Sequence, residues 1–449
     1  LSYFFRKPFL HHYTDSTNKR LLSVLTIIVL VAAVLGASAA AYTPRPGVLS
    51  PDEVNFNGKT VTILVGDLGY TGHNGGLPTD ERVREAEVLF NVKIETQSLG
   101  TKDVVDTLTA RIMAGDSKLD VIRMPHRYGY YTLVSTGMLL PVSEILPAEY
   151  YEALPSVDRY TIEKLEYQNN LYGFGVVYGL FNPTMMFTIY NRDMIEQEGL
   201  QDPYELYLNG EWSLETMTEL AVAVTKDLDG DGQPDQFGIE DKSVSHDSRI
   251  YRIAAANGAE IAKPNSEGKW VFTYNQPEAL EVMTQVAAWR KDLEITGGSL
   301  AGGTALFNTH NHLAGTRNLT INFGMVPIPS AVPGEYRYPV FDFAMNMLPL
   351  NSEYPEGLIA LTDFLFREED GEEFLDFNIN SYMKDEEHFR VYMDAVENWQ
   401  GEGDPFQELI WAKTQQAVIS VINGEKGAAA AMDEIAPTVQ AELDDLFKQ

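Results

Sequence analysis

The sequence predicts an α/β protein whose first part is a parallel sheet covered by helices. Near the start of the chain, short β-branched runs alternate with segments of helical periodicity, which is the pattern of a βαβαβ unit. A hydrophobic content of 44% over 449 residues can bury a large core, and the length favours two or three domains. The chain has no cysteine, so disulfides, thiolate metal sites and cysteine nucleophiles are excluded.

The N-terminal segment, residues 1–41, is typical of a secretory signal peptide. Basic residues precede an apolar run over residues 21–35, and small residues follow it. Cleavage after Ala39 or Ala41 would leave a mature chain that begins near Tyr42. An uncleaved anchor is the weaker alternative, because the run is shorter than the ~20 residues that span a bilayer. No cysteine follows the run, which argues against a lipid-anchored lipoprotein.

The first elements follow one another in a regular order. Residues 60–65 form a β-branched run between two glycines and predict a buried strand. Helical spacing starts near Asp80, and residues 92–96 predict a second strand. A further helix ends at Gly115 and leads into a third strand over residues 120–124. In such a sheet, ligands approach the carboxyl ends of the strands.

The pattern changes from about Tyr172, where glycine and aromatic residues precede an extended run over residues 185–190. We expect the chain to cross into a second domain there. The later elements are expected as helices around residues 212–225 and 277–292, strands at 270–274, 322–329 and 341–347, and C-terminal helices at 407–423 and 437–447.

The charge and the missing motifs exclude several functions. With 33 basic and 65 acidic side chains, the net charge of −32 opposes binding to nucleic acid or anionic lipid. The sequence has no Gly-x-Ser-x-Gly elbow, no His-Glu-x-x-His and no phosphate loop. His310 and His312 are expected in a loop without a third metal ligand. We therefore expect no catalytic residues.

The segment over residues 227–235 resembles a calcium-binding loop. Carboxylates at Asp227, Asp229, Asp231 and Asp235, with Gln233 between the last two, can converge on one hard cation. Gly238 stands where an EF-hand has its bidentate Glu, so a complete site must borrow a ligand such as Glu240 or Asp241, or be weak. The alternative is a turn-rich solvated loop that binds no metal, because Asp and Gly cluster in turns.

Several segments together resemble the extracellular solute-binding proteins of ABC sugar importers, the family that includes the maltodextrin-binding proteins. The resemblance depends on their order and spacing along the mature chain. The segments are residues 61–65, 85–94, 114–121, 137–142, 189–194, 323–329 and 411–424, together with Trp212 and Ser213. The chain departs from the family pattern at residues 303–307 and in the His-rich loop that follows them.

The resemblance implies the two-lobed type II fold of periplasmic binding proteins, in which each lobe is a mixed, mainly parallel sheet flanked by helices. Crossing strands at a hinge join the lobes. The implied divisions are an N-lobe first part at residues 42–185, a C-lobe first part at 186–338, an N-lobe return segment at 339–368, and C-terminal helices at 369–449 that complete the C-lobe. The acidic loop becomes a structural calcium site of the second lobe.

The resemblance also implies ligand contacts. Trp411 lies as far before the glycine that ends its helix as the family's sugar-stacking tryptophan, which makes it the expected stacking platform. The other expected contacts follow strands or lie beside the crossing segments. They are Asp67, Tyr70, Arg127, Tyr128, Tyr178, Asp342 and Asn346.

The function expected from the resemblance is capture of a carbohydrate, most simply an oligosaccharide, and its delivery to an ABC permease in the membrane. A monomer without catalytic activity, outside the cytoplasmic membrane, is implied. Two classes of alternative remain open at this point. One is a secreted glycan lyase or hydrolase. The other is a binding protein for a peptide or polyamine, or a sensor or adhesin for the same sugar.

Overall fold

The computed structural model describes residues 42–66, 77–99, 104–115, 119–178, 184–244, 247–340, 343–367, 380–397 and 406–448. The chain divides into Leu1–Thr43 and a compact unit, Pro44–Gln449, that contains every helix and strand named below. None of the helices in these ranges is both long and apolar enough to cross a bilayer.

The first sheet has four strands in the order β10-β3-β1-β2. Its central strand β1 (Thr60–Gly66) runs parallel to β2 (Lys93–Leu99) and β3 (Val121–Pro125), while β10 (Ala344–Met347) runs antiparallel to β3. β1 is buried from its second residue onward, as its β-branched sequence predicts. The expected βαβαβ unit is confirmed.

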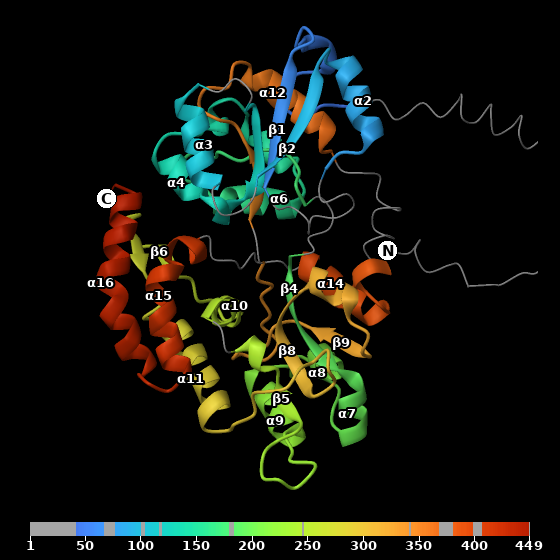
Figure 1. Cartoon of the computed structure of the whole chain (residues 1–449), viewed down its shortest axis with the longest axis vertical. Helices are drawn as coiled ribbons and strands as arrows, with labels where there is room; N and C mark the ends of the chain where they lie inside the picture. Colours follow the sequence, from blue (N-terminus) through green and yellow to red (C-terminus); the bar gives the residue numbers. More distant parts are fainter. Residues whose placement is uncertain are drawn as a thin grey trace, which may run out of the picture. The chain divides into compact units, whose positions relative to one another are not determined.

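Helices surround the first sheet (Figure 1). α2 begins where the Thr79 side chain accepts a hydrogen bond from the Arg82 amide at 3.2 Å, which caps the helix. The helices of this part are α2 (Asp80–Leu89), α3 (Val104–Met113), α4 (Tyr130–Ser135), α5 (Ala148–Glu152), α6 (Ser156–Lys164) and α12 (Pro355–Leu365).

The second sheet has the strand order β5-β8-β4-β9. β4 (Met186–Asn191) is antiparallel to both β8 (Ala305–His312) and β9 (Phe323–Val326), and β5 (Phe237–Ile239) is parallel to β8. The expectation of a loop at His310 and His312 is wrong, because pairing with β4 extends β8 to His312.

The helices that follow β4 are held in place by buried side chains on their packing faces. Trp212, just before α9, is fully buried and donates to the Pro327 carbonyl at 2.9 Å, while the Ser213 side chain caps the helix. A short hairpin, β6 (Ala262–Pro264) with β7 (Trp270–Phe272), lies apart from the two sheets. The helices are α7 (Arg192–Glu198), α8 (Pro203–Leu208), α9 (Leu214–Val224), α10 (Asp247–Ala256) and α11 (Pro277–Lys291).

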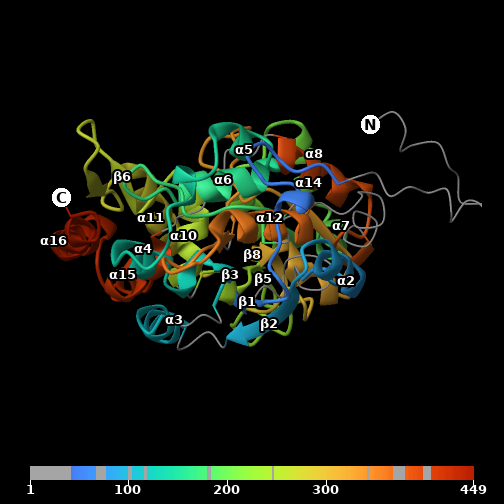
Figure 2. The same ribbon diagram turned by 90° about the horizontal axis from the view of Figure 1, so that it is seen from above.

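The C-terminal helices are α14 (Glu386–Glu397), α15 (Gln407–Ile422) and α16 (Ala428–Leu446). In the two views of Figures 1 and 2, α15 and α16 lie beside α11, and α10 is close to them. The expected last helix, residues 437–447, is too short. The preceding alanines are strong helix formers, so the helix starts at Ala428 and contains Pro437 in its interior.

Two crossing segments of the chain lie side by side. Met185, directly before β4, pairs antiparallel with Val340, and the Met186 amide donates to the Pro339 carbonyl at 2.8 Å. One segment leads from the first sheet into the second, and the other leads back to β10. The described parts of these two crossing segments are therefore held together by backbone pairing.

Candidate functional site

The carboxyl ends of β1 and β3 meet at one edge of the first sheet, because the two strands are parallel. β1 ends at Gly66, and β3 ends at Pro125 opposite Ala344 of β10. A single turn of 3-10 helix, His126–Tyr128, follows β3 directly. This edge is the candidate binding edge of the first sheet.

Arg127 and Tyr128 lie together at the candidate binding edge. The Arg127 guanidinium sits over the Tyr128 ring, 4.4 Å from its centroid. Gly66 leaves room for Met124 of β3, since a Cβ there would lie only 3.0 Å from the Met124 Cβ. The Tyr128 ring is buried and supports the partly exposed Arg127 guanidinium, whose N–H groups are the kind of donor that sugar hydroxyls accept from. Contact of either side chain with a ligand stays a prediction.

His126 is a residue of this edge that the sequence analysis missed. It is buried, and its Nδ1 accepts a hydrogen bond from the Phe343 amide at 3.3 Å. Burial and the adjacent Arg127 lower the pKa of His126 to about 3, so the ring is neutral at pH 7. The sequence feature that could have identified His126 is its position directly after the third strand, next to Arg127. Among the described residues, its buried Nε2 has no hydrogen-bond partner.

Tyr178 and Asn346 hold the crossing segment against the first sheet. The Tyr178 hydroxyl accepts from the Ala344 amide at 3.0 Å, and the residue is 3% exposed. Asn346 is fully buried and donates to the Phe174 carbonyl at 2.8 Å. The structure therefore places both side chains among protein partners beneath the edge, and their contact with a ligand stays a prediction.

Arg123 of β3 is the buried centre of this arrangement. Its Nη1 donates to the Val176 carbonyl at 2.7 Å and to the Asn346 Oδ1 at 2.8 Å, and its guanidinium lies 3.9 Å from the Phe366 ring centroid. Burial lowers the pKa of Arg123 to about 9, and Asp158 opposes that shift. The sequence analysis missed it because its partners come from segments far apart in the chain.

The second sheet contributes an edge where β8 ends and β4 begins. The Leu313 amide, just past β8, donates to the Met185 carbonyl at 2.9 Å. His312 lies near Arg252 of α10, and burial together with that cation lowers the pKa of His312 to about 4. The Nδ1 of His312 accepts from the Gly315 amide at 3.1 Å. A neutral imidazole and a buried guanidinium thus lie beside the crossing segments.

The side chains of the remaining predicted ligand contacts lie outside the part of the protein that the structure describes. Asp67, Tyr70 and Asp342 lie outside the described residues. Trp411 belongs to the first part of α15, and its side chain also lies outside them. Their roles stay predictions.

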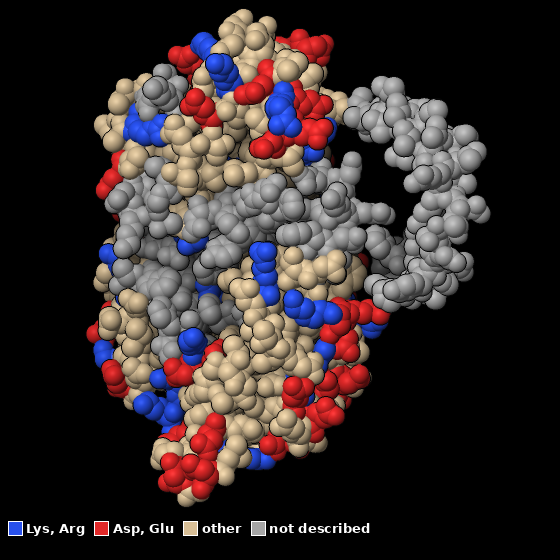
Figure 3. All heavy atoms as spheres, turned by 45° about the vertical axis from the view of Figure 1, so that its right-hand side comes forward, with Lys and Arg blue, Asp and Glu red and all other residues tan. Residues whose placement is uncertain are grey.

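The acidic loop between α9 and β5 brings three of its carboxylates together. Oxygens of Asp227, Asp229 and Asp235 lie within 4.8 Å of one another, and all three side chains are exposed. Figure 3 shows acidic side chains gathered at the lower end of the molecule, where Figure 1 draws this loop. Glu240 and Asp241, the ligands that the loop was expected to borrow, bond Asn308 and Arg290 instead.

Backbone amides fix the carboxylates of the loop. Asp227 accepts from the amides of Gly230 at 2.7 Å and Gly232 at 2.8 Å, which lowers the pKa of Asp227. Asp235 accepts from the amides of Leu228 and Asp229. These hydrogen bonds hold the Asp227 and Asp235 carboxylates in place, as a hard-cation site requires.

The sequence model of the bacterial extracellular solute-binding proteins matches residues 81–372, well over half of the chain. No curated protein sequence matches.

Solved structures match over most of the chain. A cyclic alpha-maltosyl-1,6-maltose binding protein from Arthrobacter globiformis has a TM-score of 0.64 at 13% identity, covering 87% of this chain and 99% of its own. An ABC substrate-binding protein from Listeria monocytogenes in complex with cycloalternan has a TM-score of 0.57 at 16% identity, covering 87% and 99%. The maltose/maltodextrin-binding domain from Bdellovibrio bacteriovorus bound to maltotriose has a TM-score of 0.57 at 16% identity, covering 86% and 99%.

These likenesses show the fold. The chain has the α/β architecture of type II periplasmic binding proteins, with two lobes of sheet flanked by helices, as the sequence predicts.

Proposed function

The chain belongs to the bacterial extracellular solute-binding proteins, and from this membership we propose that it is the extracytoplasmic binding component of an ABC importer that captures a carbohydrate. The observation that carries the proposal is the extent of the structural match. Three binding proteins, each named for an oligosaccharide or solved with one bound, match along 99% of their own length. A permease in the membrane would receive the captured sugar.

The edges described above supply the chemistry that a sugar needs. Arg127, supported by the Tyr128 ring, gives hydrogen-bond donors at the end of β3. Trp411 is proposed as the aromatic platform of the second lobe. A ligand that touches both lobes stabilises the closed arrangement of the lobes, because it gains contacts there that an open arrangement lacks. The paired crossing segments at Met185 and Val340 are the proposed pivot.

Export from the cytoplasm accompanies this function. We propose that residues 1–41 direct secretion and are cleaved after Ala39 or Ala41, without a lipid anchor. N-terminal sequencing of the protein recovered from the native host tests the cleavage, and a start before Ala39 would contradict it.

A thermal-shift screen of the chain from Tyr42 onward tests the sugar assignment. Oligosaccharides, monosaccharides, polyamines and short peptides are compared, because a ligand that binds only the folded state raises the melting temperature. We expect a saturable rise with one class of sugar and no new product after prolonged incubation. A response confined to polyamines or peptides would replace the sugar with that ligand, and turnover of the sugar would make the protein an enzyme.

We also propose that the acidic loop holds a structural Ca²⁺. The donor set fits this ion, since Asp227, Asp229 and Asp235 offer only carboxylate oxygens, which hard cations prefer. Asp231 and the Gln233 carbonyl complete the proposed set. The ion would neutralise the repulsion among the carboxylates at this end of the second lobe.

A further inference from the structure

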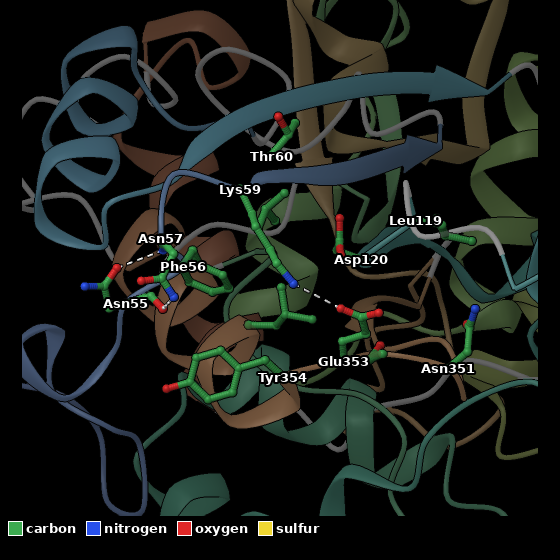
Figure 4. A pocket seen from close by; sticks show the side chains of 13 residues that line it. Asn55, Phe56, Asn57, Lys59, Thr60, Leu119, Asp120, Asn351, Glu353 and Tyr354 are labelled. Carbon is green, nitrogen blue, oxygen red and sulfur yellow. Dashed lines mark hydrogen bonds and ion pairs between the residues drawn. The ribbon is translucent and has the colours of Figure 1, made fainter.

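A pocket of about 490 Å³ opens at the edge of the first sheet opposite the candidate binding edge (Figure 4). It lies at Thr60, where β1 begins, and at Asp120, just before β3. β1 has seven residues, so the pocket is about 20 Å from the other end of the strand. A ligand at the candidate binding edge could not fill it. Its volume falls within the range of about 300–1,000 Å³ that is usual for small-molecule sites.

The lining of the pocket combines an apolar floor with a polar rim. The floor consists of buried side chains, namely Phe56, Val61, Leu119 and Leu358. Figure 4 shows the Lys59 and Glu353 side chains turned toward one another at the rim, with Asp120 and Asn351 further along it. The rim thus presents an ammonium, two carboxylates and an amide around the apolar floor.

An aromatic ring in a fixed position completes the pocket. The Tyr354 ring packs 5.6 Å from the Phe56 ring, centroid to centroid. Gly357 makes room for it, since a Cβ at that position would lie 2.4 Å from the Tyr354 ring. The ring is consequently held between Phe56 and the first turn of α12 rather than free to rotate.

The polar groups of the rim can bind a ligand with little loss of protein stability. Lys59 and Glu353 form an ion pair at 3.2 Å, and their side chains are 70% and 77% exposed. Such exposed pairs contribute little to stability, so both groups can turn to a ligand without loss of the fold. The Asp120 Oδ2 accepts from the Thr62 amide at 2.8 Å, which orients that carboxylate.

We propose that this pocket is a second binding site, for a neutral carbohydrate residue. A sugar ring has an apolar face that matches Tyr354 and the floor, and hydroxyls that match the donors and acceptors of the rim. One cation against two carboxylates disfavours an anionic ligand. The site goes beyond the proposed function, because it is separate from the edge where the transported solute would bind.

Methyl NMR of Val61, Leu119 and Leu358 tests the site, because these side chains line the floor of the pocket. The protein is titrated with glucose, maltotriose, mannotriose and spermidine. We expect saturable shifts of the floor methyls with at least one sugar. The absence of saturable shifts with all three sugars, or shifts with spermidine only, would overturn the proposal.

Two variants and a matched control assign the shifts. Tyr354→Leu keeps apolar packing on Phe56 but removes the aromatic face, and the double variant Lys59→Ala/Glu353→Ala removes polar rim groups. Each is expected to weaken the pocket affinity at least tenfold. The double variant Lys426→Ala/Glu434→Ala removes another exposed ion pair, 2.6 Å long and remote in sequence, and should leave it unchanged. Unchanged affinity in both pocket variants would contradict the site.

Calorimetry separates this site from the proposed transport function. Wild type and Tyr354→Leu should bind the transported solute equally, since that solute binds elsewhere. Calorimetric sugar binding that Tyr354→Leu abolishes completely would refute a sugar as the transported solute and leave the pocket site standing. A pull-down on insoluble starch or mannan then distinguishes a free sugar from a polysaccharide chain as the source of the bound residue.

Discussion

His388 is a buried imidazole whose hydrogen bonds define its protonation state. Its Nδ1 accepts from the Lys384 amide at 3.1 Å, and its Nε2 lies 3.0 Å from the Phe323 carbonyl, to which it donates. The ring also stacks on Phe323 at 4.6 Å. Burial lowers the pKa of His388 to about 4, although Asp385 opposes the shift. The neutral ring is therefore part of the contact between α14 and β9.

The low pKa makes stability depend on pH. Between pH 6.5 and about 4 the unfolded chain binds a proton at this position and the folded chain does not, so stability falls as the pH falls through that window. We expect His388 to account for a loss of about 2–3 kcal/mol between pH 7 and pH 4. Urea unfolding of wild type and His388→Gln at several pH values measures it. Equal pH dependence in both proteins would contradict a neutral His388.

Trp411 tests the sugar site at a single residue. If its indole stacks on the ligand, Trp411→Ala should weaken binding by about 1–3 kcal/mol through lost apolar contact. The melting temperature of the free protein should change little, because the substitution removes a ligand surface. Calorimetry with the ligand found in the screen measures the affinity. Unchanged affinity together with a lower melting temperature would assign Trp411 to the core.

The residues at the site show the limits of sequence reasoning. Arg127 and Tyr128 could be found because they follow a strand that is recognisable by itself. Arg123 could not, since its role depends on Asn346 and on the Val176 carbonyl, which only the folded chain brings to it. His126 also follows that strand, but it is buried against Phe343, which lies just before β10 and is remote in sequence.

The acidic loop is an element whose proposed ion can be removed. A chelator should lower the melting temperature, because an ion that binds only the folded state at a hundred times its dissociation constant adds about 2.7 kcal/mol. Asp227→Asn and Asp235→Asn should abolish the difference between calcium and chelator. Glu215→Gln is the matched control, because Glu215 is an exposed carboxylate of α9 outside the loop, and it should leave the difference unchanged. No effect of chelator on wild type would eliminate the calcium site.

The contact between α9 and β5 depends on Gly238. A Cβ there would lie 2.4 Å from the Ala221 carbonyl oxygen and 2.5 Å from its Cα. Because backbone cannot move aside, Gly238→Ala should push the strand from the helix and cost about 2–4 kcal/mol in unfolding free energy. In Gly427→Ala the new Cβ meets no atom within 4 Å, so that control should cost less than about 1 kcal/mol. Chemical denaturation compares the two, and equal stabilities would refute the close approach.

Helices and strands could be predicted from the sequence where the pattern that indicates them lies within a short stretch of the chain. The strand expected at residues 60–65 is β1 at Thr60–Gly66, and the helix expected at residues 277–292 is α11 at Pro277–Lys291. The start of α16 was wrong because proline usually marks a first turn, whereas Pro437 lies inside this helix. The pairing of β8 as far as His312 also escaped prediction, since it depends on β4.

At the scale of the whole molecule, the sequence predicts the two-lobed class because the order of many weak segments is informative. The first parallel strands follow from local alternation. The antiparallel pairing of β10 with β3 does not, because Ala344 and Pro125 are brought together only by the return of the chain. Long-range pairings of this kind are set by the packing of both layers, which no short window of sequence contains.

Phe447 shows how distant parts of the chain become one cooperative unit. Its ring stacks on Trp270 at 5.1 Å and on Tyr167 at 5.5 Å, and it contacts Phe406 and Tyr131 edge-on at 5.9 and 6.4 Å. The Tyr167 hydroxyl also donates to the Leu446 carbonyl at 2.6 Å. Tyr131 of α4, Tyr167 after α6 and Phe447 at the end of α16 thus share one aromatic cluster.

Removing the ring should therefore weaken contacts among segments more than 300 positions apart in the sequence. Phe447→Ala is expected to lower the free energy of unfolding by about 2–4 kcal/mol, because four ring contacts are lost together. Leu350→Ala is the control, since Leu350 is 55% exposed and should cost less than about 0.5 kcal/mol. Calorimetric unfolding measures both. A single transition shifted to lower temperature fits a shared cluster, whereas an unchanged transition would mean that the cluster contributes nothing to the stability of the whole.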